Sequence, residues 1–280
     1  MKLVTFVRPG GVPEPGIIDG SKITPLSGAG FSSVISLIAG GADALKRAAA
    51  VEAPDVPLKS VKLMSPIPRP PKIICVGLNY RDHAIESNMA IPKTPTIFCK
   101  FPTSVIGPGD TIVLPKKSTQ PDYEAEFAVV VGKGGRYIKA KDWQKHVFGY
   151  CNLHDVSARD FQLATSQWTI GKTFDTFCPM GPYIATADEI KDPHALDISL
   201  TLNGKVLQKS NTKELIFGVP ALIEHLSSVF TLEPGDIIST GTPAGVGFAR
   251  KPPIYLKKGD TVVVKVQGLG ELSNPVTVED

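Results

Sequence analysis

Apolar residues along this chain gather in short runs, and these runs predict more strands than helices. The segment from 72 to 80, KIICVGLNY, is a continuous apolar run that leads into a loop, as a buried strand does. Asp19-Gly20 and Asn203-Gly204 each lie between two short apolar pieces and predict hairpin turns. Three further segments place Gly-Asp directly ahead of a β-branched strand: 107–115, 233–241 and 257–266.

Helical spacing is confined to a few stretches. It predicts a long helix over 32–51, weakened by Gly40-Gly41, and helices near 139–146, 157–165 and 212–230. Strands therefore outnumber helices without alternating regularly with them, which predicts an α+β fold with a mixed, largely antiparallel, rolled-up sheet. The proline-rich connector at 65–71 marks a boundary between a small N-terminal α+β domain, 1–66, and a larger domain, 67–280.

Composition narrows the possible partners. The chain has 280 residues, of which 42% are hydrophobic and 20% charged, as in an ordinary globular protein. A net charge of +3, without a run of basic residues interleaved with aromatics, gives no reason to expect nucleic acid as a partner. No apolar run approaches the roughly 20 residues that span a bilayer, so we expect no membrane partner.

The cysteines and the first residues bear on the compartment. Cys75, Cys99, Cys151 and Cys178 are far apart in the sequence, sit among apolar residues and form no CxxC pair. We therefore expect reduced core thiols rather than disulfides or a zinc site. The opening MKLVTFVRPGG has the pattern of a strand and a turn, unlike a signal peptide or an Arg-rich presequence. We expect a cytoplasmic protein, with the mitochondrion as the alternative.

The segment 121–131, PDYEAEFAVVV, places acids at alternating positions ahead of an apolar run. In a strand Asp122, Glu124 and Glu126 share one face, where three like charges repel unless they are solvated, protonated or bound to a cation. Either this is a solvated edge strand, or the acids bind a hard divalent cation. Asp155 ends a second apolar strand and could complete an oxygen cage, although a turn or capping acid looks the same. Oxygen ligands without Cys or paired His favour Mg²⁺, Mn²⁺ or Ca²⁺ over zinc.

Three further side chains are candidates for holding an anion. Arg159 and Gln162 lie three apart on one predicted helix face, which suits a substrate carboxylate but equally suits a solvated surface. Lys172 lies in an apolar and aromatic segment, where it could hold a developing enolate or carboxylate charge or extend to the surface. The Gly171-Lys172 pair is not part of a Walker A motif, because that motif needs glycine where this chain has Ser166.

A histidine and a carboxylate form a possible acid–base pair. His83 and Glu86 are three apart after a buried strand and would meet on a helix, although most such pairs are surface contacts. The polar segment that follows, 86–95, has the composition of a mobile lid. The glycine-rich loop 240–247 could offer backbone N–H groups and the Thr242 hydroxyl to an anion, as many tight turns could.

Taken in order, VGLNYRDH, the E-x-E strand, HDVSARDFQ, GKTFDTFCPMGP and STGTPAGVG resemble the fumarylacetoacetate hydrolase superfamily over roughly residues 72–275. The resemblance implies that the larger domain is a rolled, mixed β-sheet catalytic domain, usually dimeric, with Mg²⁺ or a similar ion. It assigns the metal to Glu124, Glu126 and Asp155, and it leaves Asp122 outside the metal's ligands.

The resemblance also implies roles for the remaining candidates. Arg159, Gln162, Lys172 and Thr242 match positions that hold the carboxylate and carbonyl oxygens of the substrate. His83 and Glu86 match a catalytic dyad that acts as a base or activates water when a lid closes.

The resemblance implies small β-dicarbonyl or 2-keto acids as substrates, with a metal-stabilised enolate as the common chemistry. The branch that this sequence is most similar to is associated with enol–keto tautomerisation of oxaloacetate, which we expect first. The alternatives are hydrolysis of a C–C bond in acylpyruvates or fumarylacetoacetate, and decarboxylation of oxaloacetate. Two non-enzymatic alternatives are an idle metal-binding structural protein and a metal-free module that binds small dicarboxylates.

Overall fold

The computed structural model describes residues 1–279 and is built mainly from two sheets. The larger sheet has twelve strands, namely β1 (Lys2–Val7), β2 (Glu14–Asp19), β3 (Lys22–Pro25), β4 (Val56–Pro57), β5 (Lys62–Met64), β6 (Ile73–Gly77), β7 (Thr96–Lys100), β8 (Val105–Ile106), β11 (Ala125–Val131), β12 (Val147–His154), β14 (Cys178–Thr186) and β17 (Ile237–Ser239). The smaller sheet has five, namely β9 (Ile112–Leu114), β15 (Asp197–Leu202), β16 (Lys205–Asn211), β18 (Thr261–Val266) and β19 (Glu271–Val278). Most strand pairs are antiparallel, with parallel pairs β6–β17, β8–β14 and β9–β19, so the predicted α+β fold with mixed sheets is confirmed.

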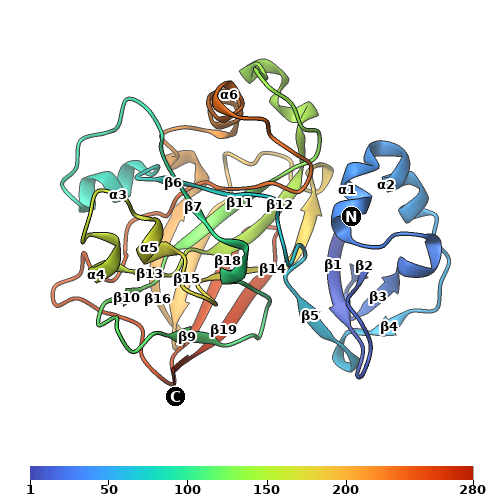
Figure 1. Ribbon diagram of the computed structural model, residues 1–280, viewed down its shortest axis with the longest axis horizontal. Coiled ribbons are helices and arrows are strands. Elements are labelled where there is room, and N and C mark those ends of the chain that lie inside the picture. The colour runs from blue at the N-terminus through green and yellow to red at the C-terminus, as the bar shows by residue number, and fades with distance from the viewer. Residues whose placement is uncertain (280) are drawn as a thin grey trace.

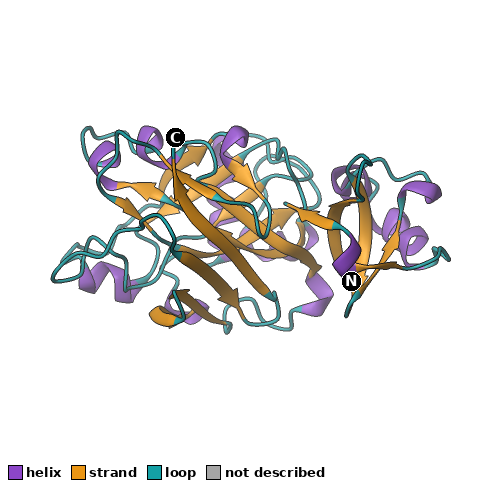
Figure 2. Ribbon diagram, turned by 90° about the horizontal axis from the view of Figure 1, so that it is seen from below, coloured by secondary structure: helices purple, strands orange, loops and turns teal. Residues whose placement is uncertain are grey.

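The helices are short: α1 (Val34–Ala39), α2 (Gly41–Ala49), α3 (Arg81–Glu86), α4 (Arg159–Gln162), α5 (Thr169–Lys172) and α6 (Val219–Val229). The single helix predicted over 32–51 is two helices, because Gly41 adopts a positive φ of 59° that interrupts the helical path. The helix predicted near 139–146 is a 3₁₀ helix over Ala140–Lys145. In Figure 2 the helices lie at the periphery and the strands fill the middle.

Two predicted helices are shorter than expected. The segment 157–165 contains only the four residues of α4, because Ser157 and Ala158 form strand β13 and pair with strand β10 (Pro121–Asp122). The segment 212–230 begins with a separate 3₁₀ turn, and α6 starts only at Val219. Pro220 has no N–H group and is tolerated only in the first turn, which explains this late start.

The predicted hairpins are present. β2 and β3 are joined across Gly20, and β15 and β16 are joined by Asn203 and Gly204, with Leu202 paired to Lys205. Asn203 and Gly204 have φ values of 51° and 78°, as the two central residues of a type I′ turn require.

The N-terminal part lies beside the rest of the molecule in Figure 1, where it is drawn in blue. Strand β1 pairs with β2 and β5, and it joins the large sheet where Lys2 and Leu3 pair with β14. Val4, Phe6 and Ile23 form a small buried cluster of this part. The boundary at residue 66 stays a prediction.

Strand β11 runs through the middle of the larger part, between β12 and β17. All seven of its residues are buried, as the continuous apolar run predicts. The rings of Phe127 on β11 and Tyr150 on β12 stack with centroids 5.1 Å apart. This packing holds β11 firmly against β12, so the acids at the start of β11 lie next to the end of β12.

Cysteine burial follows the prediction at three of four positions. Cys75, Cys151 and Cys178 are buried free thiols, but Cys99 is exposed because it lies on β7, an end strand of the large sheet.

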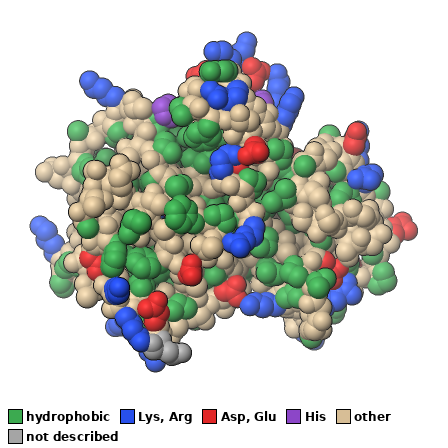
Figure 3. All heavy atoms as spheres, in the orientation of Figure 1, with side chains coloured by type: hydrophobic (Ala, Val, Ile, Leu, Met, Phe, Trp, Pro, Cys, Tyr) green, Lys and Arg blue, Asp and Glu red, His purple; other side chains and the backbone are tan. Residues whose placement is uncertain are grey.

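Within residues 1–279, no helix has the length and apolarity needed to cross a bilayer. On the face drawn in Figure 3, Lys and Arg side chains are scattered rather than gathered into one stripe.

Strand packing around β12 gives a stability prediction. A Cβ atom at Gly149 would lie 2.1 Å from the Ala185 carbonyl oxygen on β14, so Gly149→Ala forces two central strands apart. We expect the variant to lose about 1–3 kcal/mol of unfolding free energy, measured by urea denaturation. Gly28→Ala is the control, because a Cβ there meets no atom within 4 Å. Equal urea midpoints for Gly149→Ala and the wild type would contradict this packing.

Candidate metal and substrate site

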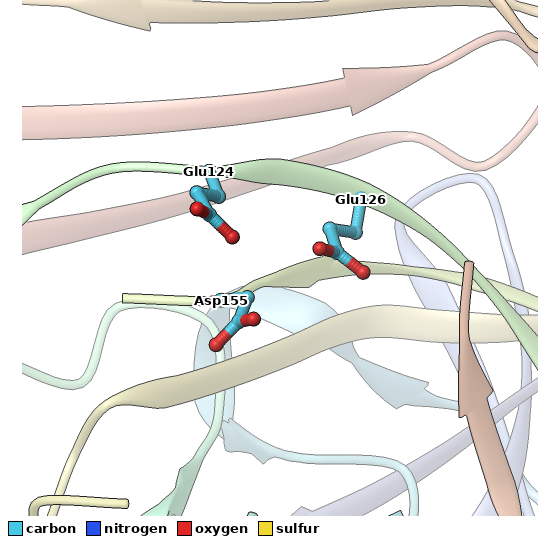
Figure 4. Close-up of side chains that lie close together, drawn as sticks. All are labelled: Glu124, Glu126 and Asp155. Carbon is cyan, nitrogen blue, oxygen red and sulfur yellow. The ribbon is translucent and has the colours of Figure 1, made fainter. Parts of the chain in front are cut away.

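The predicted acidic residues meet inside the protein. Glu124 directly precedes β11, Glu126 is its second residue, and Asp155 directly follows β12. Figure 4 shows their three carboxyl groups converging. One oxygen from each lies within 4.8 Å of the others, and the residues are only 5%, 2% and 0% exposed. The solvated edge strand is therefore excluded.

Sheet register brings these acids together. β11 and β12 are antiparallel, with Glu126 opposite Leu153, so the start of one strand meets the end of the other. The Asp155 N–H donates to the Glu124 carbonyl oxygen at 3.0 Å. This backbone bond fixes Asp155 against Glu124 in a way that no local sequence pattern reveals.

Two buried lysines neutralise part of this charge. Lys172 Nζ lies 2.7 Å from Glu124 Oε2 and 2.8 Å from Asp155 Oδ2, so its side chain turns inward rather than extending to the surface. Burial alone would lower the pKa of Lys172, but the charges of Asp155 and Glu124 outweigh it and raise the pKa. Lys100 Nζ donates to Asp155 Oδ1 at 2.6 Å and to the Val156 carbonyl at 3.1 Å. Sequence reasoning missed Lys100; the only signal was its place at the end of the strand TIFCK.

Glu126 differs from the other two acids because no cationic side chain among residues 1–279 pairs with it. Its Oε2 accepts hydrogen bonds from Ser239 Oγ and from the Gly241 N–H, the latter at 2.9 Å. Burial and the charges of Asp155 and Glu124 raise the pKa of Glu126 to about 8. For Glu124, burial opposes ionisation, but the charges of Lys172 and Arg159 lower its pKa well below the usual range. Glu126 is thus the acid whose ionisation depends most on a bound cation.

The donor set fits a divalent cation. Four acids and three bases of the cluster are each at most 5% exposed: Asp122, Glu124, Glu126, Asp155, Lys100, Arg159 and Lys172. With all four acids ionised the cluster carries one excess negative charge, and a divalent ion would make it singly positive. Oxygens bound to one ion at 2.0–2.6 Å lie at most about 5 Å apart, which the three acids satisfy.

Arg159 and Gln162 lie on α4 and are buried at 3% and 5% exposure, so the solvated helix face is excluded. Arg159 Nη1 donates to Gln162 Oε1 at 2.8 Å. Arg159 Nη2 forms an ion pair with Glu124 Oε1 at 2.6 Å, without the alignment of a hydrogen bond. A buried guanidinium with an unsatisfied N–H donor is suited to bind the carboxylate of a ligand.

The predicted dyad forms on α3. His83 Nδ1 lies 3.4 Å from Glu86 Oε2, and Glu86 also accepts the Gly245 N–H at 2.9 and 3.0 Å. Partial burial opposes ionisation of Glu86, but the hydrogen bonds from His83 and Gly245 lower its pKa. Glu86 is therefore a carboxylate that can orient the imidazole ring.

These side chains line a cavity of about 190 Å³. Its lining includes seven predicted site residues: His83, Glu124, Glu126, Arg159, Gln162, Lys172 and Thr242. Its apolar wall includes Phe98 and Trp168, which sequence reasoning missed and whose rings pack edge to face. Trp168 lies over Gly77, where a Cβ would be only 2.2 Å from the ring.

Thr242 reaches the cavity, but its hydroxyl already has protein partners. It donates to the Ala125 carbonyl oxygen at 2.9 Å and accepts from Gln208 Nε2 at 2.9 Å. A substrate contact from this hydroxyl would have to share these bonds.

Comparison with known proteins agrees with this geometry. The family model described as "Fumarylacetoacetate (FAA) hydrolase C-terminal" matches residues 72–277. The chain is 50% identical over 234 residues to oxaloacetate tautomerase FAHD2A, mitochondrial, of Bos taurus, covering 83% of this chain and 74% of the relative. It is 49% identical over 233 residues to the Homo sapiens protein of that name, covering 82% and 74%.

Solved structures give the same result. Fumarylacetoacetate hydrolase from Exiguobacterium antarcticum superposes with a TM-score of 0.89 at 35% identity, covering 100% of both chains. Maleylpyruvate hydrolase from Sphingobium sp. SYK-6, in complex with manganese(II) and pyruvate, gives 0.83 at 33% identity, again over 100% of both chains. The chain therefore belongs to the fumarylacetoacetate hydrolase family of enzymes. The bovine and human relatives, at 50% and 49% identity, both carry the name FAHD2A. The buried acidic triad and the manganese complex of the neighbour both point to a divalent metal.

The metal site gives a second prediction. Glu126→Gln keeps the shape of the side chain but removes the charge that no lysine or arginine compensates. We expect Mn²⁺ affinity, measured by electron paramagnetic resonance titration, to fall by more than about 100-fold, because hard divalent ions require anionic oxygens. Glu224→Gln on the exposed face of α6 serves as the control. A Glu126→Gln protein that binds Mn²⁺ like the wild type would remove Glu126 from the ligand set.

Proposed function

We propose that this protein is a metal-dependent oxaloacetate enol–keto tautomerase, with Mg²⁺ as its ion and Mn²⁺ or Ca²⁺ as alternatives. The observation that carries the proposal is that Glu124, Glu126 and His83 line one small cavity, with Asp155 beside the two glutamates and Glu86 behind the histidine. The names of the bovine and human relatives support the choice of substrate and reaction.

Charge and size both suit a small keto diacid. The cavity of about 190 Å³ is below the roughly 300–1,000 Å³ typical of drug-sized ligands, so it suits a ligand of few carbon atoms. The three basic side chains of the cluster, with a divalent ion, leave an excess positive charge for carboxylates. In this proposal Arg159 and Gln162 hold one carboxylate of the substrate, and Lys172 faces its keto or enol oxygen.

The reaction moves one proton from the enol oxygen at C2 to C3. An ion held by Glu124, Glu126 and Asp155 would supply Lewis acidity toward the substrate oxygens. Lys172, which remains an ammonium, stabilises negative charge as the enol loses its proton. His83 takes the proton from the enol oxygen and delivers it to C3, and Glu86 stabilises the imidazolium between the two transfers. The apolar wall of Phe98 and Trp168 restricts the access of water, which favours proton transfer over hydrolysis.

C–C bond hydrolysis is the second candidate, because a structural neighbour is a maleylpyruvate hydrolase that holds manganese and pyruvate. Decarboxylation of oxaloacetate is the third. All three involve an enolate. Tautomerisation protonates the enolate of oxaloacetate at C3, whereas decarboxylation releases the enolate of pyruvate as CO₂ leaves, and hydrolysis releases it as water adds to the acyl carbonyl group.

One assay separates these candidates. Purified protein with Mg²⁺ is added to enol-oxaloacetate, and the decay of enol absorbance is followed while pyruvate is measured in the same sample. Rapid enol loss without pyruvate is the expected result. Pyruvate formed in step with enol loss would make the protein a decarboxylase, and unchanged rates of both would reject oxaloacetate as the substrate and direct the assay to acylpyruvates.

The dyad gives a third prediction. His83→Ala should slow enol loss by about 100- to 10,000-fold, the usual contribution of a general acid–base group, while Mn²⁺ affinity stays unchanged. His225→Ala is the control, since His225 lies on α6 and does not line the cavity. A His83→Ala enzyme with the wild-type rate would exclude the dyad from the mechanism.

Other parts of the proposal concern assembly and location. We propose that the catalytic unit is residues 67–280 and that it acts as a homodimer. β7 ends the large sheet with Ile97 37% exposed, and Phe101 just beyond it is 50% exposed. An open edge with apolar side chains is a suitable surface for a second copy. The bovine and human relatives are named as mitochondrial; the cytoplasm stays a prediction for this chain.

A further inference from the structure

The glycine-rich loop that follows β17, residues 240–248, donates backbone hydrogen bonds to three carboxylates. The Gly241 N–H donates to Glu126, the Gly245 N–H donates to Glu86, and the N–H groups of 247 and 248 donate to Asp122. The backbone N–H groups of this loop, which the sequence suggested for binding an anion, therefore bind carboxylates of the protein itself. Two of these acids have a proposed role, in metal binding and in the dyad, while Asp122 has none.

Asp122 is a fully buried carboxylate with four donors. Its Oδ1 accepts the N–H groups of Tyr123 at 2.8 Å and Gly247 at 2.7 Å. Its Oδ2 accepts Arg159 Nε at 2.9 Å and the Phe248 N–H at 3.0 Å. Only a carboxylate offers acceptor oxygens on both sides, so an amide could satisfy at most one pair of these donors.

The close approach of the loop to Asp122 is built into the sequence. A Cβ at Gly247 would lie 2.5 Å from Asp122 Oδ1 and 1.9 Å from the Ile254 carbonyl oxygen. Strand β10 pairs with β13, with Asp122 opposite Ser157, which places the carboxylate beside the start of α4 and therefore beside Arg159.

Asp122 and Phe248 of the loop together hold the Arg159 side chain on two sides. Asp122 binds its Nε edge, and the Phe248 ring lies under the guanidinium at 4.6 Å from the centroid. The opposite edge, with Nη1 and Nη2, faces Gln162 and Glu124, which line the cavity. The guanidinium is thus fixed in orientation while the edge that meets an incoming carboxylate stays on the cavity side.

We propose that Asp122 is a positioning residue that locks Arg159 to the glycine-rich loop, so that the guanidinium is oriented before the substrate carboxylate arrives. The role rests on the proposed function of this site. Orientation in advance removes the entropic cost of immobilising a long side chain on binding, so it acts on substrate affinity. A carboxylate that merely stabilised the fold would affect every activity of the site alike.

The first test is Asp122→Asn. We expect KM for enol-oxaloacetate to rise by about 10- to 100-fold, the usual effect of losing a partner that orients a ligand-binding group, with kcat and Mn²⁺ affinity within about threefold of wild type. A KM equal to that of the wild type overturns the proposal, and so does an equal fall in kcat and Mn²⁺ affinity.

The second test is a double-mutant cycle with Arg159→Ala. If Asp122 acts through Arg159, adding Asp122→Asn to Arg159→Ala should change kcat/KM by less than about threefold, because residues acting as one unit are not additive. A multiplied loss would show that Asp122 acts independently of Arg159, and it would overturn the proposal.

Asp160→Asn is the matched control. Asp160 neighbours Arg159 on α4, but its carboxylate accepts from Ser118 Oγ and the Thr119 N–H, both at 2.8 Å, away from the guanidinium. We expect wild-type KM for this variant. If Asp122→Asn does not fold, Phe248→Leu removes the ring under Arg159 and should raise KM in the same selective way. A Phe248→Leu enzyme with wild-type KM would then overturn the proposal.

Hydrogen exchange separates this proposal from the function on which it rests. In Asp122→Asn the amides of 247 and 248 should exchange at least about tenfold faster than in the wild type and in Asp160→Asn, because they lose a buried acceptor. If the wild-type protein did not act on enol-oxaloacetate, the proposed tautomerase function would be rejected, but the exchange rates at 247 and 248 would still test the contact between Asp122 and the loop. Unchanged exchange in Asp122→Asn would reject the lock itself.

Discussion

The need to neutralise buried charge is the constraint on which the rest of this structure depends. Seven charged side chains lie almost without solvent exposure around one small cavity. A buried charge is tolerated only when it is paired and hydrogen-bonded, so each acid needs a specific donor. Lys100 and Lys172 both donate to Asp155, and Lys172 also donates to Glu124. Backbone N–H groups donate to Glu126 and Asp122. The fold therefore brings lysine side chains and backbone N–H groups from distant parts of the chain to these buried carboxylates.

Strand pairing and one loop perform this task together. The antiparallel register of β11 and β12 sets Glu124, Glu126 and Asp155 at one end of the buried strands. The loop after β17 then covers that end and supplies directed N–H groups. The ends of β11 and β12 hold the proposed metal ligands, while His83 lies on α3, outside the sheets. This division suits an enzyme whose ion must stay fixed while its substrate enters and leaves.

Local patterns in the sequence predicted a large part of this arrangement. The alternation in PDYEAEFAVVV predicted that Asp122, Glu124 and Glu126 share one face, because period-two spacing is independent of the rest of the fold. The family resemblance, rather than the pattern, selected Glu124, Glu126 and Asp155 as the candidate metal ligands. The patterns could not decide whether Arg159, Gln162 and Lys172 were buried, since burial depends on segments far away in the chain. Lys100 was missed for the same reason: a lysine that ends a strand usually reaches solvent, and its partner Asp155 lies 55 residues later. The buried setting of Asp122 was missed because two of its four donors come from the loop at 247–248, about 125 residues later.

The partners of Glu126 have a consequence for how the chain is made. Ser239 and Gly241 follow Glu126 by 113 and 115 residues, so the acidic strand leaves the ribosome long before its donors exist. Until then its carboxylates stay hydrated, and the strand cannot enter a dry interior at low cost. Contacts of such long range also form slowly. Completion of this centre is thus a late event in biosynthesis. A nascent chain stalled ahead of β17 would leave one edge of β11 unpaired and exposed to the quality-control machinery of the cell.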